Sequence, residues 1–147
     1  MQKERFKLIP SVYLLLERDG KTLLTRRFQT GFEDGKYALA SGHADGKETL
    51  REALAREVKE EIGIVLDINT IVLVHTMHRW CGDHERVDFF FTAGQWQGEI
   101  ANMEPKKCDD VAWFPIAQMP ENTVHYIAQA IASWQSGVSY SEYNWPK

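Results

Sequence analysis

The segment from residue 48 to residue 62 carries the strongest periodic pattern in the chain. Its large aliphatic side chains recur every four residues, at Leu50, Leu54, Val58 and Ile62. Residues with this spacing lie along one face of an α-helix, and an apolar face of that kind is normally buried. Gly63 follows directly and is typical of a residue that ends a helix. The pattern therefore predicts a helix that packs one face against a core.

Most of the remaining apolar residues fall in short runs that are typical of β-strands. The dipeptide Asp19-Gly20 is a strong signal for a hairpin turn. A second helix is predicted from Glu121 to Ser136, whereas the tail from Gly137 onward has no clear pattern. Strands are expected at residues 6–18, 22–27, 37–41, 65–79, 86–96 and 111–114, and loops at 28–36 and 80–85. Strands with two main helices that do not strictly alternate with them indicate an α/β (α+β) sandwich, with a mixed β-sheet between the helices.

Length and composition are those of a globular protein with one core. The chain has 147 residues, 44% of them hydrophobic and 26% charged, so a single domain over residues 1–147 is predicted. No stretch approaches the roughly 20 apolar residues of a membrane helix, and the N-terminus has no apolar signal segment. Cys81 and Cys108 lack metal-binding spacing and are expected to be free thiols. We therefore expect a cytoplasmic protein without a membrane partner.

The balance of charge limits the partners of the protein. The net charge is −4, which gives no basic field for binding nucleic acid. A polyanionic small molecule could approach such a chain only with local help from a metal ion or from a few well-placed cations. The composition therefore predicts no nucleic-acid partner and points toward a divalent ion.

Three glutamates of the first predicted helix share one face. Glu57, Glu60 and Glu61 stand at positions i, i+3 and i+4, where like charges cost roughly 0.2–0.5 kcal/mol per pair. A solvated surface explains most acidic helix faces. A bound cation is the alternative, and clustered carboxylates suit a hard ion such as Mg²⁺. Gly42 and Gly46 keep the preceding loop free of bulk, so that its backbone and the helix N-terminus can approach a phosphate.

The spacing around these glutamates distinguishes the two explanations. The segment from Gly42 to Ile64 resembles the Nudix box, written G-x5-E-x7-R-E-U-x-E-E-x-G-U with U a bulky aliphatic residue. Every fixed position is matched, by Gly42, Glu48, Arg56, Glu57, Val58, Glu60, Glu61, Gly63 and Ile64. The order of strands and the C-terminal helix are also similar to the α/β/α sandwich of that family.

The resemblance implies a role for each charged residue of the box. Glu57 and Glu61 would be the principal ligands of Mg²⁺, for which Mn²⁺ is a possible substitute. Glu60 would be a further ligand or the base that activates water. Arg56 would orient the glutamates through salt bridges, and Glu48 would support the loop or bind the metal from outside. Members of the family hydrolyse a nucleoside diphosphate linked to another group.

The box does not specify the substrate, so recognition must come from residues outside its fixed positions. Six residues are candidate substrate contacts: Arg26, Arg27, Phe28, His43, Trp80 and Asn122. The arginines and the histidine suit phosphate, the aromatic rings suit stacking on a base, and the asparagine suits a base edge. Each has a structural alternative, namely a solvated strand end, core or dimer packing, a loop histidine, or a helix cap.

A later acidic segment resembles a loop that supplies an extra base or metal ligand in some family members. Glu104 and Asp109 are the candidates there, and an ordinary surface turn is the alternative. The strand face predicted to carry His78 and Trp80 is opposite the one carrying His75, Met77 and Arg79.

In length and layout the chain is most similar to small mutator-type enzymes of the family. That similarity favours a nucleoside triphosphate, such as oxidised 8-oxo-dGTP, cleaved to monophosphate and pyrophosphate by a monomer or homodimer. An ADP-ribose or nucleotide-sugar pyrophosphatase is the alternative within the enzymes. A non-catalytic nucleotide-sensing module is the alternative of another class, although such modules usually lack part of the box. An isomerase of the same fold would need histidines and a cysteine in contexts that this chain does not have.

Overall fold

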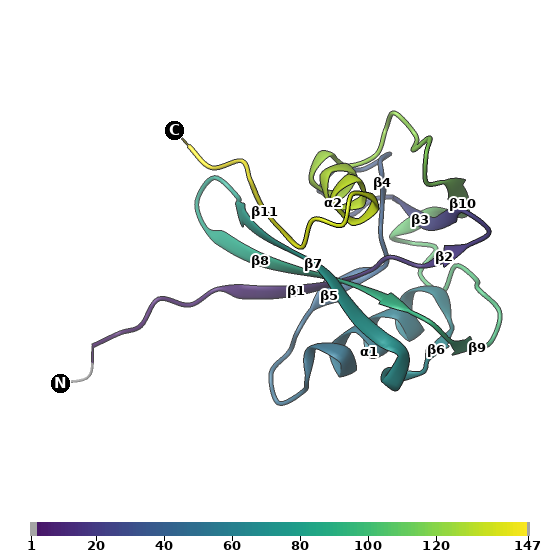
Figure 1. Ribbon diagram of the computed structural model, residues 1–147, viewed down its shortest axis with the longest axis horizontal. Coiled ribbons are helices and arrows are strands. Elements are labelled where there is room, and N and C mark those ends of the chain that lie inside the picture. Colours follow the sequence, from purple (N-terminus) through teal and green to yellow (C-terminus); the bar gives the residue numbers. More distant parts are fainter. Residues whose placement is uncertain (1–2, 147) are drawn as a thin grey trace.

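A mixed five-stranded sheet forms the centre of the computed structural model, which describes residues 3–146 (Figure 1). The strand order is β11-β7-β8-β1-β5. The β1–β8 and β11–β7 pairs are parallel, and the β1–β5 and β7–β8 pairs are antiparallel. The strands are β1 (Ile9–Leu14), β5 (Ser41–His43), β7 (Ile71–Trp80), β8 (Glu85–Ala93) and β11 (Tyr140–Tyr143). The mixed sheet expected from the sequence is confirmed.

A second sheet has the order β10-β3-β2, and β4 also pairs with β3. Its strands are β2 (Glu17–Arg18), β3 (Lys21–Arg27), β4 (Tyr37–Ala38) and β10 (Cys108–Pro115). The hairpin predicted at Asp19-Gly20 joins β2 to β3, and both turn residues have positive φ, 53° and 74°. A short pair, β6 (Val65–Leu66) and β9 (Trp96–Gln97), completes the strands.

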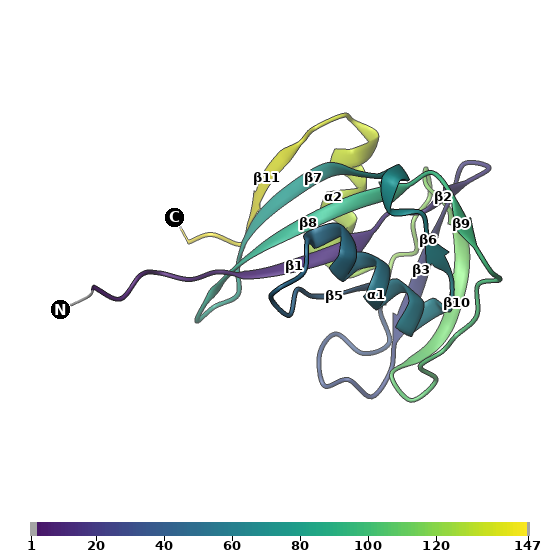
Figure 2. The same cartoon turned by 90° about the horizontal axis from the view of Figure 1, so that it is seen from below.

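The two helices cover opposite faces of the central sheet (Figures 1 and 2). They are α1 (Leu50–Ile62) and α2 (His125–Gln135). Side chains alternate along β1 and the residues after it, so one strand supplies both cores. Val12, Leu14 and Leu16 pack in the core beneath α1, whereas Tyr13 and Leu15 pack in the core beneath α2. This arrangement is the predicted α/β/α sandwich.

Local signals set the ends of α1. Thr49 accepts a hydrogen bond from the backbone N–H of Glu52, whose side chain accepts one from the N–H of Thr49, so the two form a capping box. At the other end Gly63 adopts the left-handed conformation with φ 79°. The helix therefore begins two residues later than predicted and ends where predicted.

The second helix begins later than its sequence suggests. Residues 121–124 were expected to be helical, but α2 begins at His125. The backbone of Tyr37 instead accepts from Val124 N and donates to Asn122 O, which holds residues 122–124 beside β4. The side chain of Asn122 donates to the carbonyl of Gly35, so it does not cap the helix.

Several expected strands are shorter or interrupted. The segment 65–79 is divided into β6, a short 3₁₀ helix η1 (Ile68–Thr70) and β7. The segments 37–41 and 86–96 are each divided in two, and the strand expected at 111–114 extends over all of β10. His75, Met77 and Arg79 share one face of β7, as predicted, and the structure shows that this face is the buried one.

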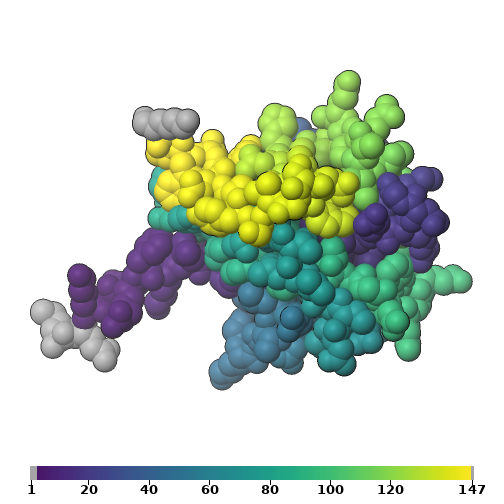
Figure 3. Space-filling view, viewed as in Figure 1, coloured from purple at the N-terminus to yellow at the C-terminus, as the bar shows by residue number. Residues whose placement is uncertain are grey.

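The ends of the described chain differ. Residues 3–8 extend away from the body, whereas residues 137–146 lie against it (Figure 3). Cys81 and Cys108 are both free thiols. Within residues 3–146, neither helix has the length and apolar character needed to cross a membrane.

Candidate active site

Two glutamates near the end of α1 lie against strand β5. The backbone N–H of Ser41 donates to Glu61 Oε2 at 2.8 Å. Glu57 lies over Gly42, where a Cβ atom would come within 2.1 Å of Glu57 Cδ. Any side chain at position 42 would therefore displace this carboxylate, which explains why the box begins with glycine. Glu60 lies nearer solvent, with 53% of its side chain exposed.

Arg56 ties the loop before α1 to the carboxylates on the helix. Its guanidinium donates to Glu57 Oε1 at 2.8 Å, to Glu48 Oε1 at 2.8 Å and to the carbonyl of His43 at 3.2 Å. The hydrogen bond from Arg56, followed by one from the N–H of Asp45, lowers the pKa of Glu48. Glu48 is thus held by Arg56 and does not line the cavity below α1. This geometry suits the supporting role rather than direct metal contact.

The two carboxylates that face β5 differ in compensating charge, because Arg56 pairs with Glu57 whereas no lysine or arginine of the described residues forms a salt bridge with Glu61. Burial, together with the neighbouring charges of Glu57 and Glu104, raises the pKa of Glu61 to about 8, although the hydrogen bond from the Ser41 N–H opposes the shift. Burial also raises the pKa of Glu57, against the lowering effect of Arg56. Crowded, partly desolvated carboxylates of this kind favour either a proton or a cation.

These carboxylates open into a cavity of about 690 Å³. The acidic residues that line it are Asp45, Glu57, Glu60, Glu61 and Glu104. The basic residues that line it are Arg26, Arg27 and Lys107. Glu104 comes from the loop before β10, where Asn102 accepts a hydrogen bond from its backbone N–H. The cavity therefore brings acidic and basic side chains together, a combination that suits a metal-bound phosphate chain.

The donor set fits a divalent cation that retains water ligands. Among the described residues, no three or more histidine, cysteine, aspartate or glutamate side chains converge into a preformed metal cage. Mg²⁺ does not need such a cage, because it typically binds through one or two carboxylates together with substrate phosphates and water. Glu57 and Glu61, brought together over Ser41 and Gly42, are the residues that would hold it.

The two predicted phosphate contacts are placed differently. Arg27 donates to the carbonyl of Phe32 at 2.6 Å and to Thr30 Oγ1 at 3.0 Å, which fixes it to the loop above the cavity. Arg26 is paired with Asp109 at 2.7 Å. Asp109, one of the two candidates for an extra base or metal ligand, is thus held by Arg26 and does not line the cavity. The other candidate, Glu104, does line it.

The other candidate substrate contacts are only partly brought together. His43 lines the cavity, but Phe28, Trp80 and Asn122 do not. Trp80 packs instead near Trp145, with ring centroids 5.6 Å apart. Sequence reasoning missed Ser41 and Lys107, and only Ser41 had a signal, since it immediately precedes the box. The substrate roles of all these residues stay predictions.

The chain is similar to one family model and to several known proteins. Residues 7–134 match the family model described as the NUDIX domain. A CTP pyrophosphohydrolase of Escherichia coli (strain K12) is 38% identical over 69 residues, which cover 47% of this chain and 51% of that protein. The NAD-capped RNA hydrolase NudC of Pseudomonas entomophila is 33% identical over 116 residues, covering 78% of this chain and 39% of that protein. An ADP-ribose pyrophosphatase of Methanocaldococcus jannaschii is 35% identical over 78 residues, covering 52% and 46%.

Solved structures agree with the fold. A MutT NUDIX hydrolase from Burkholderia pseudomallei superimposes with a TM-score of 0.78 and 25% identity, over 86% of this chain and 98% of that one. The chain spans about half or less of the length of the curated relatives named above. The family match covers most of the chain, and it includes the carboxylate-bearing helix and the glycine beneath it. The chain belongs to the NUDIX domain family.

Proposed function

We propose that the protein is a divalent-metal-dependent hydrolase that cleaves a phosphoanhydride bond in a nucleoside diphosphate derivative. One observation carries the proposal. Glu57 and Glu61 lie at Gly42 and Ser41, in a cavity that is also lined by Arg26, Arg27 and Lys107. Carboxylates that bind a cation and basic side chains that bind an anion together suit a metal–pyrophosphate complex.

Each charged residue of the site would have its own role in hydrolysis. Glu57 and Glu61 would hold Mg²⁺, or Mn²⁺ in its place. The bound ion would offset charge on the phosphates and lower the pKa of a water molecule. Glu60 lines the cavity from the helix and would orient or deprotonate the attacking water, with Glu104 as the alternative base. Arg56 keeps Glu57 in place, and Arg27, which lines the cavity, would contact the phosphate chain.

The substrate that we favour is a nucleoside triphosphate, cleaved to a monophosphate and pyrophosphate. The similarity to a CTP pyrophosphohydrolase and to a MutT-type structure supports this choice. An oxidised purine triphosphate is the specific candidate. A nucleoside diphosphate linked to a sugar is the second candidate, because an ADP-ribose pyrophosphatase is also among the relatives. A purely nucleotide-sensing role is disfavoured by the complete set of box glutamates.

A substrate panel with matched variants tests the proposal. Phosphate and pyrophosphate release would be measured with Mg²⁺ on canonical and oxidised nucleoside triphosphates, dinucleoside polyphosphates, ADP-ribose and nucleotide sugars. A NAD-capped RNA belongs in the panel because NudC is a relative. Glu57→Gln and Glu61→Gln should abolish turnover, whereas Glu17→Gln on β2 removes an exposed carboxylate elsewhere and should not. Full activity in both box variants would overturn the proposed role of these glutamates.

A further inference from the structure

A second cavity, of about 450 Å³, adjoins the acidic one across strand β5. The two share Arg27, Ser41, Gly42 and His43 in their walls. The remaining wall of the second cavity comes largely from β1, β7, β8 and α2. One extended molecule can therefore contact Glu57 and Glu61 at one end and the second cavity at the other.

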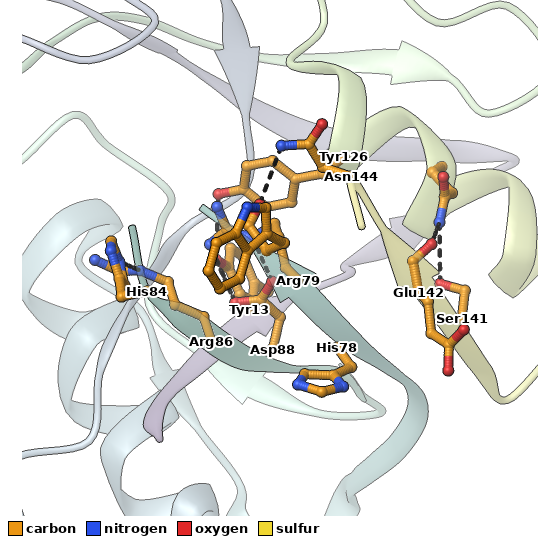
Figure 4. Close-up of polar contacts among 12 residues, drawn as sticks. Tyr13, His78, Arg79, His84, Arg86, Asp88, Tyr126, Ser141, Glu142 and Asn144 are labelled. Carbon is orange, nitrogen blue, oxygen red and sulfur yellow. Dashed lines mark hydrogen bonds and ion pairs between the residues drawn. The ribbon is translucent and has the colours of Figure 1, made fainter. Parts of the chain in front are cut away.

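A buried, rigidly held arginine forms part of this cavity. Arg79 on β7 is 8% exposed. Its Nε donates to Asp88 Oδ2 at 2.7 Å, and its Nη2 lies 3.4 Å from the hydroxyl of Tyr13 (Figure 4). Its guanidinium also lies 3.8 Å from the ring centroid of Tyr126. These contacts fix the orientation of the guanidinium before any ligand arrives.

The lining of this cavity carries further positive charge. Arg86 on β8 donates to His43 Nε2 at 2.6 Å and to His84 Nε2 at 3.2 Å. With Arg27 and Arg79, it places three guanidinium groups around the cavity. None of the described residues that line this cavity is acidic. The nearby carboxylate of Asp88 is fully buried behind the wall and already bonded to Arg79 and Tyr13. The cavity thus has an excess of positive charge, in contrast to its acidic neighbour.

A hydroxyl group in the same wall lacks a partner. Ser11 on β1 is 2% exposed, and its Oγ is the buried side-chain polar atom without a hydrogen bond among the described residues. Such a group is costly to bury unless something bonds to it. Since Ser11 lines the cavity, a ligand there can supply the missing bond.

We propose that this cavity binds a phosphate group of the substrate that lies beyond the cleaved bond and is not one of the phosphates held at the metal site. The inference rests on the proposed function, because it assigns one end of the same substrate. The metal-bound phosphates would lie at Glu57 and Glu61, and the distal phosphate would lie among Arg79, Arg86 and Ser11. A nucleoside triphosphate should therefore be preferred over its diphosphate, and a distal sugar that carries a phosphate over the same sugar without one.

The test compares substrates that differ by a single phosphate. The ratio of kcat/KM would be measured for ATP against ADP, and for ADP-ribose 1″-phosphate against ADP-ribose. Arg86→Gln should lower these ratios about tenfold, the effect of one charge-assisted hydrogen bond, and Ser11→Ala should lower them less. Lys21→Gln is the matched control, since it removes one exposed charge at the opposite end of β3 from Arg27. If a variant lowered kcat/KM equally for both substrates of a pair, or left both values unchanged, the inference would be overturned while the proposed function stands.

A binding measurement distinguishes a failure of this inference from a failure of the proposed function. Inorganic tripolyphosphate would be titrated calorimetrically into the metal-free protein, so that the result does not depend on turnover. Weaker binding to Arg86→Gln and Ser11→Ala than to Lys21→Gln supports the cationic subsite even if none of the substrates is hydrolysed. No binding to the wild type, or equal binding to all variants, excludes it. Thermal melts of each variant confirm that the compared proteins are folded.

Discussion

The carboxylate of Glu57 occupies the space that a side chain at position 42 would need, because a Cβ atom on Gly42 would lie 2.1 Å from Glu57 Cδ. Gly42→Ala should therefore displace this carboxylate. We expect Mg²⁺-dependent hydrolysis to fall by at least about tenfold, with little loss of stability, because the displaced atoms belong to the end of a flexible side chain. Gly94→Ala is the control, because its added methyl group would meet Thr70 at an ordinary 3.4 Å. Equal kinetics for the two variants would contradict this account.

Arg56 acts on the site through Glu57 and Glu48, so replacing it should reduce activity without removing a metal ligand. Arg56→Lys loses the forked geometry that reaches both glutamates. The expected loss is roughly 10–100-fold in activity or metal affinity. Steady-state kinetics over a range of Mg²⁺ concentrations would measure it. Arg51→Lys, on another part of the same helix, should behave like the wild type, and an unchanged Arg56→Lys would argue against the positioning role.

The raised pKa of Glu61 predicts how the stability of the metal-free protein depends on pH. The folded-state pKa is about 8, against an ordinary value of 4.5, so the native state favours the protonated acid. Stability from this group is present below pH 4.5 and is lost as the pH rises toward 8, by at most about 1.4 kcal/mol per pH unit. Glu61→Gln removes this dependence. Denaturation in a chelator should show the variant equal to the wild type at pH 5 and more stable at pH 9, and parallel curves would refute the shift.

Metal removal provides a complementary prediction. A chelator should abolish hydrolysis, and Mg²⁺ should restore it. Because the metal competes with the proton on Glu61, Mg²⁺ should raise the melting temperature more at pH 8.5 than at pH 6. Calorimetry in buffers of different ionisation enthalpy would reveal the released proton. Hydrolysis should also increase toward alkaline pH, since the metal-bound water must lose a proton. A pH-independent rate between neutral pH and pH 9 would count against a metal-activated water, provided that chemistry limits turnover.

The ion pair between Arg79 and Asp88 should dominate stability on the other side of the sheet. Asp88 is fully buried, so Asp88→Asn leaves the guanidinium without its counter-charge. Breaking a buried pair in this way typically costs about 3–5 kcal/mol. Urea denaturation would measure the loss. The exposed pair between Lys36 and Glu33 offers a comparison, and Glu33→Gln there should cost under about 1 kcal/mol.

Much of the fold follows from local patterns in the sequence. The four-residue spacing of Leu54, Val58 and Ile62 and the glycine after them locate α1 and its buried face. The Nudix box resemblance predicts that Arg56 orients the glutamates through salt bridges, and Arg56 contacts both Glu57 and Glu48. The side-chain alternation along β7 was likewise predicted correctly.

The remaining features depend on contacts between distant segments. The strand β11 forms because Tyr140–Tyr143 pairs in parallel with Thr76–Arg79, and nothing in the tail itself specifies that partner. The late start of α2 results from backbone bonds between Tyr37 and residues 122 and 124. Ser11 and Arg86 meet at one cavity only after β1 and β8 have paired, so no spacing in the sequence brings them together.

The alternation of side chains along β1 has a consequence for changes to this strand. A slip of a single residue would exchange its faces, turning the Tyr13 hydroxyl toward the apolar side of α1 and Val12 toward Asp88 and Arg79. Deletions and insertions within Ile9–Leu14 should thus be far more damaging than substitutions. The strand can pair in one register only, and that register aligns the two cores on either side of the sheet.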